Sequence, residues 1–198
     1  MQATERAADR QAACQILLKQ VHSIETGARN GFPRQQLLDT MLAFLDRHRS
    51  LFPDSDFESP RAHSRMHPLV EGDKTPYGLY VNITRPGKEA SPHCHGLWSV
   101  SAGLSGQELH RFWRLADKED AQRFDVEETH SITLQAGAAQ AMDANDIHSS
   151  FTLDSGEARV LHLFARPFAH FPRVVFYHPQ WGTRRILPQG TGRTLRGG

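Results

Sequence analysis

The first fifty residues carry apolar side chains at helical spacing. One stripe recurs in three- and four-residue steps, as on the buried face of an amphipathic helix, and comprises Ala13, Ile16, Leu17, Val21 and Ile24. Gly27 and the pair Asn30-Gly31 predict where this helix ends. A second stripe follows Pro33, a residue suited to a first helical turn, and comprises Leu37, Leu38, Met41, Leu42, Phe44 and Leu45. The pattern predicts two packed helices.

From Tyr77 onward the apolar period shortens to two. Stretches rich in β-branched and aromatic residues alternate with Gly, Asp, Asn and Pro; they read YGLYVNI, LWSVSAG, QELHRFWRL, HSITL, RVLHLFA and RVVFYH. This pattern is typical of an all-β barrel or sandwich. We therefore predict a single domain over 1–198, with a helical cap and connection at 1–70, a β-barrel at 71–188 and a mobile tail at 189–198.

Composition and charge exclude several classes of function. The 198 residues are 38% hydrophobic, enough for one core. The 23 basic and 22 acidic side chains are spread along the chain, so no basic surface for nucleic acid or an anionic membrane is indicated. No apolar run approaches the roughly 18 residues of a membrane span, and MQATERAADRQ lacks the apolar core of a secretory signal. Two cysteines are too few for a disulfide framework, so we expect a cytoplasmic protein; no feature specifies its oligomeric state.

The spacing of three of the 12 histidines indicates a metal site. His93 and His95 flank one residue, so on a β-strand both imidazoles point to the same face. Cys94 then points to the opposite face, where we expect a small core residue rather than a redox thiol or an auxiliary ligand. His148 follows a turn-prone stretch at 143–146 and is the candidate third ligand. The alternative is a set of buried structural histidines.

The surroundings of the first two histidines resemble the first motif of the cupin superfamily. Gly87 is followed by five residues, then by His93-x-His95, and then by glycines at 103 and 106. The resemblance implies a mainly β fold, the cupin double-stranded β-helix barrel, on which the two helices form an N-terminal cap.

The surroundings of His148 resemble the second cupin motif, in which a Pro-x-Gly turn precedes the histidine. Here the corresponding residues are Asp143-x-Asn145-x-x-His148. The first motif usually carries a Glu three or four residues after its second histidine, but Ser99 and Val100 occupy those positions. The resemblance therefore implies a metal held by His93, His95 and His148 without a carboxylate.

This departure is shared by cysteine dioxygenases and bacterial 3-mercaptopropionate dioxygenases, the thiol dioxygenase family. The stretch HCHGLWSV at 93–100, followed by GLSGQE at 103–108, is similar to bacterial members. The likeness extends from about Arg65 to Pro188. It implies iron(II), whose positions left open by three neutral imidazoles would admit substrate and dioxygen. Imidazole ligands also suit zinc or nickel, and no organic cofactor is implied.

His162 is the candidate polar group beside the metal. It lies in the predicted strand VLHLFA, with Val160 and Phe164 on its own face. Thiol dioxygenases carry Ser-x-His-x-Tyr on this strand, so the resemblance implies that only the histidine is kept. His162 then either adjusts an interaction with substrate or oxygen, or is a core imidazole bonded to a backbone carbonyl. Val160 and Phe164 predict a more apolar pocket than the relatives have.

Two arginines are candidate anchors for a substrate carboxylate. Arg173, in FPRVVFY, falls about where bacterial members place such an arginine, and a guanidinium fork suits a carboxylate. Arg65 lies near the corresponding position of animal-type enzymes. An ordinary surface ion pair is the alternative for each.

The resulting hypothesis is a mononuclear non-haem iron(II) dioxygenase that oxidises the thiol of a small carboxylate-bearing substrate to a sulfinate. Its expected partners are this small molecule and dioxygen. One alternative is a cupin metalloenzyme, an oxygenase or isomerase, that acts on a non-thiol molecule. The other is a non-catalytic cupin that senses a metal or ligand. The barrel does not separate these, because function depends on the site.

Overall fold

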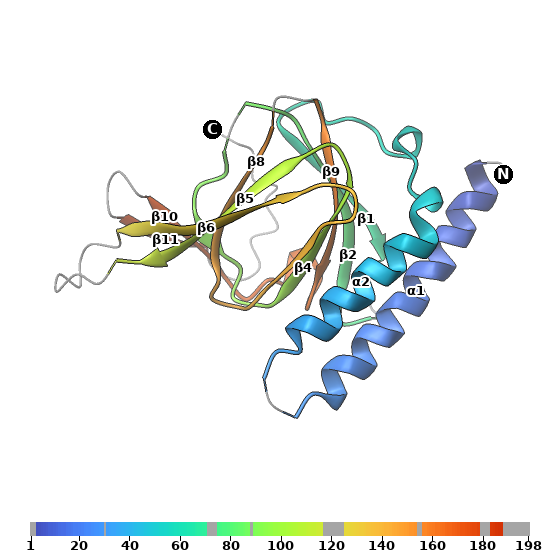
Figure 1. The fold of residues 1–198 in the computed structure, drawn as a ribbon, viewed down its shortest axis with the longest axis horizontal. Helices are drawn as coiled ribbons and strands as arrows, with labels where there is room; N and C mark the ends of the chain where they lie inside the picture. The colour runs from blue at the N-terminus through green and yellow to red at the C-terminus, as the bar shows by residue number, and fades with distance from the viewer. Residues whose placement is uncertain are drawn as a thin grey trace.

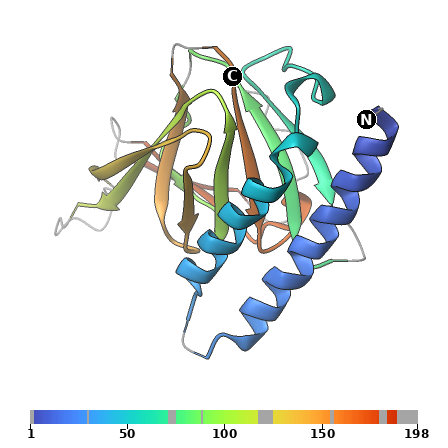
Figure 2. The ribbon, with the colours of Figure 1, turned by 45° about the vertical axis from the view of Figure 1, so that its right-hand side comes forward.

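Two N-terminal helices pack against one side of a barrel made of two β-sheets (Figure 1, Figure 2). The computed structural model describes residues 3–29, 31–70, 75–87, 89–116, 125–153, 156–178 and 183–187. The helical elements are α1 (Ala3–Gly27), α2 (Arg34–His48), η1 (Arg49–Leu51), η2 (Asp54–Asp56) and η3 (Phe168–His170). The strands are β1 (Ser64–Val70), β2 (Gly78–Thr84), β3 (His93–Cys94), β4 (Ser99–Ser105), β5 (Glu108–Leu115), β6 (Val126–Leu134), β7 (Ala139–Met142), β8 (Ile147–Thr152), β9 (Ala158–Phe164), β10 (Val174–His178) and β11 (Thr183–Leu187).

Both helices form where the apolar spacing predicts them, and α1 ends at Gly27. The buried residues of α1 are Ala13, Cys14, Leu17, Leu18 and Val21, and those of α2 are Leu37, Met41, Phe44 and Leu45. The expected stripe is wrong at Ile16, which is 58% exposed. At about 100° per residue, Ile16 lies well away from the face that Cys14 and Val21 share.

The chain passes repeatedly from one sheet to the other. One sheet has the order β1-β2-β9-β4-β7 and the other β11-β10-β3-β8-β5-β6. From β7 to β10, each successive strand joins the opposite sheet, and every strand pair is antiparallel. This winding confirms the predicted cupin-type double-stranded β-helix barrel with helices at its N-terminus.

The two-residue period divides the first sheet into an outer apolar face and an inner face. On the outer face, one core cluster joins strand residues to the buried faces of α1 and α2; its strand members include Leu79, Val81, Ile83, Val100, Ala102, Leu161 and Leu163. The residues between them in sequence point into the barrel. There Tyr80 of β2 and Ser101 of β4 both lie opposite His162 of β9. The helices therefore cover the sheet that carries His162.

The barrel begins earlier than the boundary expected at residue 71, because β1 (Ser64–Val70) pairs with β2. This strand reads SRMHPLV, and its half-exposed, polar sequence hides the two-residue period. The tail expected at 189–198 lies outside the described residues. No helix in the described part of the chain is long and apolar enough to cross a membrane.

Asp56 of η2 ties α1 to the connection before the barrel. Its carboxylate accepts hydrogen bonds from Arg6 Nε at 2.9 Å and Arg10 Nη1 at 2.7 Å. The bond from Arg6, reinforced by Arg10, lowers the pKa of Asp56 from 3.8 to about 2. A carboxyl group whose pKa is lower in the folded than in the unfolded chain stabilises the fold above both values and loses this effect as it is protonated.

We therefore expect Asp56→Asn to lower the free energy of unfolding at neutral pH, and the deficit to shrink as the pH falls from about 4 towards about 2. Urea unfolding of both proteins across this range measures it. Asp46→Asn, at an exposed position of α2, is the control and should show no such pH-dependent deficit. A deficit that is constant with pH would contradict the assignment.

Candidate metal centre

Strand pairing brings the three predicted ligands together inside the barrel. His93 lies in β3, directly opposite His148 of β8, and His95 follows β3 on the same side. The backbone N–H of Gly96 donates to the carbonyl oxygen of Ala144 at 2.9 Å, which fixes the HxH segment against the turn before His148. Two segments fifty residues apart in sequence thus form one site.

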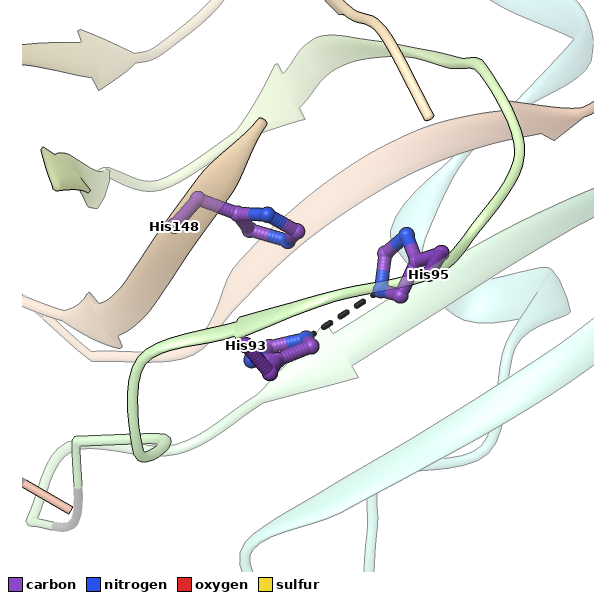
Figure 3. A group of neighbouring side chains, drawn as sticks. All are labelled: His93, His95 and His148. Atoms are coloured by element: carbon purple, nitrogen blue, oxygen red, sulfur yellow. Dashed lines mark hydrogen bonds between the residues drawn. The ribbon is translucent and has the colours of Figure 1, made fainter. Parts of the chain in front are cut away.

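The geometry of the cluster suits one shared ion. One nitrogen from each of His93, His95 and His148 lies within 4.8 Å of the others. His93 Nε2 and His95 Nε2 are 3.1 Å apart, and the three rings face one another (Figure 3). Metal–nitrogen bonds of about 2.0–2.1 Å at right angles would separate two nitrogens by about 3 Å. The residues therefore fit a divalent ion held by imidazoles.

Backbone carbonyls orient two of the ligands. The Nδ1–H of His93 donates to Ser91 O at 2.8 Å, and Nδ1 of His148 lies 3.4 Å from Asp146 O. A donor at Nδ1 leaves Nε2 with its lone pair directed at the cluster, the usual arrangement behind a metal-bound histidine. Residues next to the ligands in sequence, Ser91 and Asp146, thus orient the imidazoles of His93 and His148.

Burial keeps the three ligands neutral. It lowers the pKa of His93, and it lowers the pKa values of His95 and His148 well below the ordinary range, with the neighbouring histidines adding to the effect. A neutral imidazole retains the lone pair that a metal needs. The site is therefore ready for a cation at neutral pH without first releasing protons.

Aromatic rings surround the ligands. His95 lies 5.5 Å from the centroids of both Phe164 and Phe171, and Phe176 stacks on His93 at 5.4 Å. Phe164 thus lies beside the histidine cluster. Val160, two residues before His162 on the same face of β9, is buried and lies opposite Asn82 of β2 and Gly103 of β4.

His162 has a serine partner, contrary to the expectation that its hydroxyl neighbour is lost. Its Nδ1 lies 2.8 Å from the hydroxyl oxygen of Ser101, which comes from β4 rather than from β9. The family pattern has its serine two residues from the histidine on the same strand, where this chain has Val160. Only the pairing of β4 with β9 shows that a hydroxyl reaches the imidazole from the side. Burial lowers the pKa of His162 to about 4, so this ring is neutral too.

A second polar network in the barrel was not predicted. Glu108 Oε1 accepts a hydrogen bond from His110 Nε2 at 2.5 Å, and the Gln140 amide bonds His110 Nδ1. Thr84 donates to Glu108 Oε2 at 2.8 Å. Burial raises the pKa of Glu108, but the hydrogen bond from His110 and its electrostatic attraction have the larger combined effect. The pKa of Glu108 is therefore lowered from its ordinary value.

This network approaches the ligands through His110, whose ring lies parallel to that of His148 at 6.4 Å. A signal was present in the sequence: Glu108 and His110 are spaced to share the inner face of a strand that is otherwise apolar and basic. The barrel therefore contains a buried carboxylate, that of Glu108, which does not belong to the histidine cluster.

The two candidate anchors lie outside the ring of ligands. Arg65 is opposite Ile83, on the outer face of its sheet, and pairs with Glu58. Arg173 is exposed, and its Nη2 donates to Asn145 Oδ1 at 3.3 Å. Its stem covers Gly96, where a β-carbon would lie 2.9 Å from Arg173 Cγ. Arg173 thus borders the site beside His95, whereas Arg65 does not.

Cys94 is a core residue as predicted. It is 3% exposed and packs with Ile147, Val175 and Tyr177 behind the ligand strand.

No family model matches the chain, and no curated protein matches it. Solved structures with a similar fold include a cupin superfamily protein from Desulfitobacterium hafniense, at 14% identity and a TM-score of 0.40 over 56% of this chain and 84% of that one. A Klebsiella pneumoniae protein with a double-stranded β-helix domain is 12% identical, with a TM-score of 0.43 over 71% of this chain and 91% of that one. An oxalate oxidase in complex with glycolate is 16% identical, with a TM-score of 0.43 over 64% and 63%. Such likeness concerns the fold alone.

Replacing His93, His95 or His148 with Ala should remove most of the bound metal, because two imidazoles rarely hold a divalent ion against water. Elemental analysis and Co²⁺ titration of each variant measure this. Chelation should also lower the melting temperature of the wild type, since an ion that binds only the folded chain stabilises it. His63→Ala, at an exposed position before β1, is the control. Equal metal content in the wild type and all three variants would contradict the site.

Proposed function

We propose that this chain is a mononuclear non-haem iron(II) dioxygenase that oxidises the thiol of a small carboxylate-bearing substrate to a sulfinate. The observation that carries the proposal is the ligand set. Among the described residues, His93, His95 and His148 are the one group of three metal-binding side chains close enough to share an ion, and none of them is acidic. A neutral ligand set leaves the full charge of the ion available to an anionic thiolate.

The aromatic side chains around the three histidines support a reaction from which water is kept away. Phe164, Phe171 and Phe176 pack against the ligand rings, and apolar walls strengthen electrostatic attraction between the site and a bound anion. The carbonyls of Ser91 and Asp146 hold two of the imidazoles in place. A ferrous ion bound there would supply the activation of dioxygen.

The aromatic wall also bears on the substrate. Phe164 stands where the thiol dioxygenases that the sequence resembles carry a tyrosine, and its ring lies parallel to that of His162 at 5.7 Å. We expect a substrate with a bulkier or less polar body than free cysteine to gain more from this wall, because apolar contact there replaces a hydrogen bond.

The test is oxygen consumption by the iron-loaded protein with cysteine, 3-mercaptopropionate and bulkier thiol acids. We expect thiol-dependent oxygen uptake, a sulfinate product, and kcat/KM for cysteine at least about tenfold below that for the best bulkier acid. If cysteine is the best substrate, the interpretation of the pocket is wrong.

Two other outcomes would replace the proposal. Oxygen uptake or isomerisation with a substrate that lacks sulfur would indicate a different cupin metalloenzyme. Tight binding of a small molecule without turnover would indicate a sensor.

Arg173 is the proposed carboxylate anchor because its side chain lies over Gly96, next to ligand His95. Arg173→Lys should raise KM about tenfold or more and leave the iron content unchanged, since an ammonium cannot replace a bidentate guanidinium. Steady-state kinetics with the best thiol acid measure this. Arg166→Lys, at an exposed position after β9, is the control. Unchanged kinetics in Arg173→Lys would make this arginine a structural partner of Asn145.

A further inference from the structure

Glu108 of β5 is the one fully buried acidic side chain among the described residues, and no lysine or arginine among them is fully buried with it. Its carboxylate accepts hydrogen bonds from His110 Nε2 at 2.5 Å and from the Thr84 hydroxyl at 2.8 Å. Burial raises the pKa of this carboxyl group, but the hydrogen bond and attraction of His110 outweigh burial and lower it. The barrel therefore contains a carboxylate that is ionised at neutral pH.

A buried negative charge without a basic partner requires a cation nearby. Taking an ionised carboxylate out of water costs free energy that hydrogen bonds recover only in part. The histidine cluster has the complementary need: burial keeps its three imidazoles neutral, so they would hold a divalent ion without offsetting its charge. The same barrel thus holds an anion that lacks a cation and a site for a cation that lacks an anion.

We propose that Glu108 is the counter-charge of the ion held by His93, His95 and His148, and that it stabilises this ion through space without coordinating it. The proposal rests on the proposed metal centre and adds to it a residue outside the ligand set. The same charge weakens the attraction between the ion and a bound anion. Glu108 is therefore a positioning residue that makes the site hold its metal more tightly and an anionic substrate less tightly.

One imidazole separates the carboxylate from a ligand. Glu108 and His110 share the inner face of β5, and the ring of His110 lies parallel to that of His148 at 6.4 Å. The charge of Glu108 is also felt elsewhere in the barrel: burial lowers the pKa of His162 to about 4, and Glu108 opposes this shift. Charges inside a protein are screened far less than charges in water. The carboxylate is thus placed to act on an ion at the cluster.

His110 carries the hydrogen bond but not a compensating charge. Its Nε2–H donates to Glu108, and its Nδ1 accepts from the amide nitrogen of Gln140. The same amide nitrogen lies 3.8 Å from the sulfur of Met142, which is also an acceptor. An imidazole that accepts at Nδ1 is neutral, so the pair has a net charge of −1. The competing arrangement reverses the Gln140 amide and makes His110 an imidazolium, which would cancel the charge of Glu108.

Two substitutions separate the charge of Glu108 from its shape. Glu108→Gln keeps the shape and loses the charge, whereas Glu108→Asp keeps the charge and shortens the side chain. Visible absorption gives the Co²⁺ Kd, and azide titration of the Co²⁺-loaded protein gives the azide Kd. We expect Glu108→Gln to weaken Co²⁺ about tenfold or more and to tighten azide about threefold or more. Glu108→Asp should keep both Kd values within about threefold of the wild type.

The opposite signs distinguish a charge from a structural role. A loosened barrel would weaken Co²⁺ and azide together, whereas loss of a negative charge weakens a cation and tightens an anion. Thr152→Val is the matched control: Thr152 is buried and donates to the Thr84 hydroxyl at 2.6 Å, in the same network as Glu108. This variant loses a hydrogen bond but no charge, so we expect a lower melting temperature with both Kd values within about twofold of the wild type.

The charge of His110 is measured by ¹⁵N NMR of the Zn²⁺-loaded, ¹⁵N-histidine-labelled wild type. We expect a neutral ring with its hydrogen on Nε2. This readout does not depend on how any variant folds.

Each result decides between the alternatives. An imidazolium at His110 overturns the proposal, as does a Glu108→Gln variant whose two Kd values match the wild type or both increase. A loss of Co²⁺ affinity in Glu108→Asp as large as in Glu108→Gln also overturns it. Failure of the wild type to bind Co²⁺ would overturn the proposed metal centre, and the counter-charge with it. Absence of thiol oxidation together with the expected Co²⁺ and azide effects would overturn the proposed activity and leave the role of Glu108 intact.

Discussion

The candidate site depends on the convergence of three imidazoles, those of His93, His95 and His148, within the barrel. One nitrogen of each ring lies within 4.8 Å of the others, and among the described residues no acidic side chain joins this group. Such a cluster is held only where the backbone fixes it from several directions. Here the pairing of His93 with His148, and the bond from Gly96 to Ala144, provide that constraint. The aromatic rings then close the space around it.

The helical cap packs on the outer face of the sheet whose inner face carries His162. Its apolar residues share one core cluster with the outward-facing residues of β2, β4 and β9. That packing fixes which residues of these strands point inward, because a slip of one residue would reverse every side chain. Ser101 and His162 therefore meet inside the barrel because Val100 and Leu161, their neighbours in sequence, are held outside by the helices.

Two hydrogen-bonded sets of buried polar side chains lie in the barrel. One set joins Glu108, His110 and Gln140, and Thr84 completes the bonding of the carboxylate. The other consists of Ser101 and His162. Buried polar groups of this kind are retained only when their hydrogen bonds are made. Among the described residues, each set leaves one buried atom without a hydrogen-bond partner: Oε1 of Gln140 in the first set and Nε2 of His162 in the second.

Local spacing in the sequence predicts the two helices, the two-residue strand period and the three histidines that cluster as a candidate metal site. His93 and His95 share a face on any strand, and the turn at 143–146 positions His148. Local spacing does not show which residues meet across strands. Ser101 is sixty-one residues from His162, Gln140 is thirty from His110, and Arg65 faces outward because it lies opposite Ile83. Strand register decides such contacts, and register is set by how the two sheets and the helical cap pack together, which no local pattern encodes.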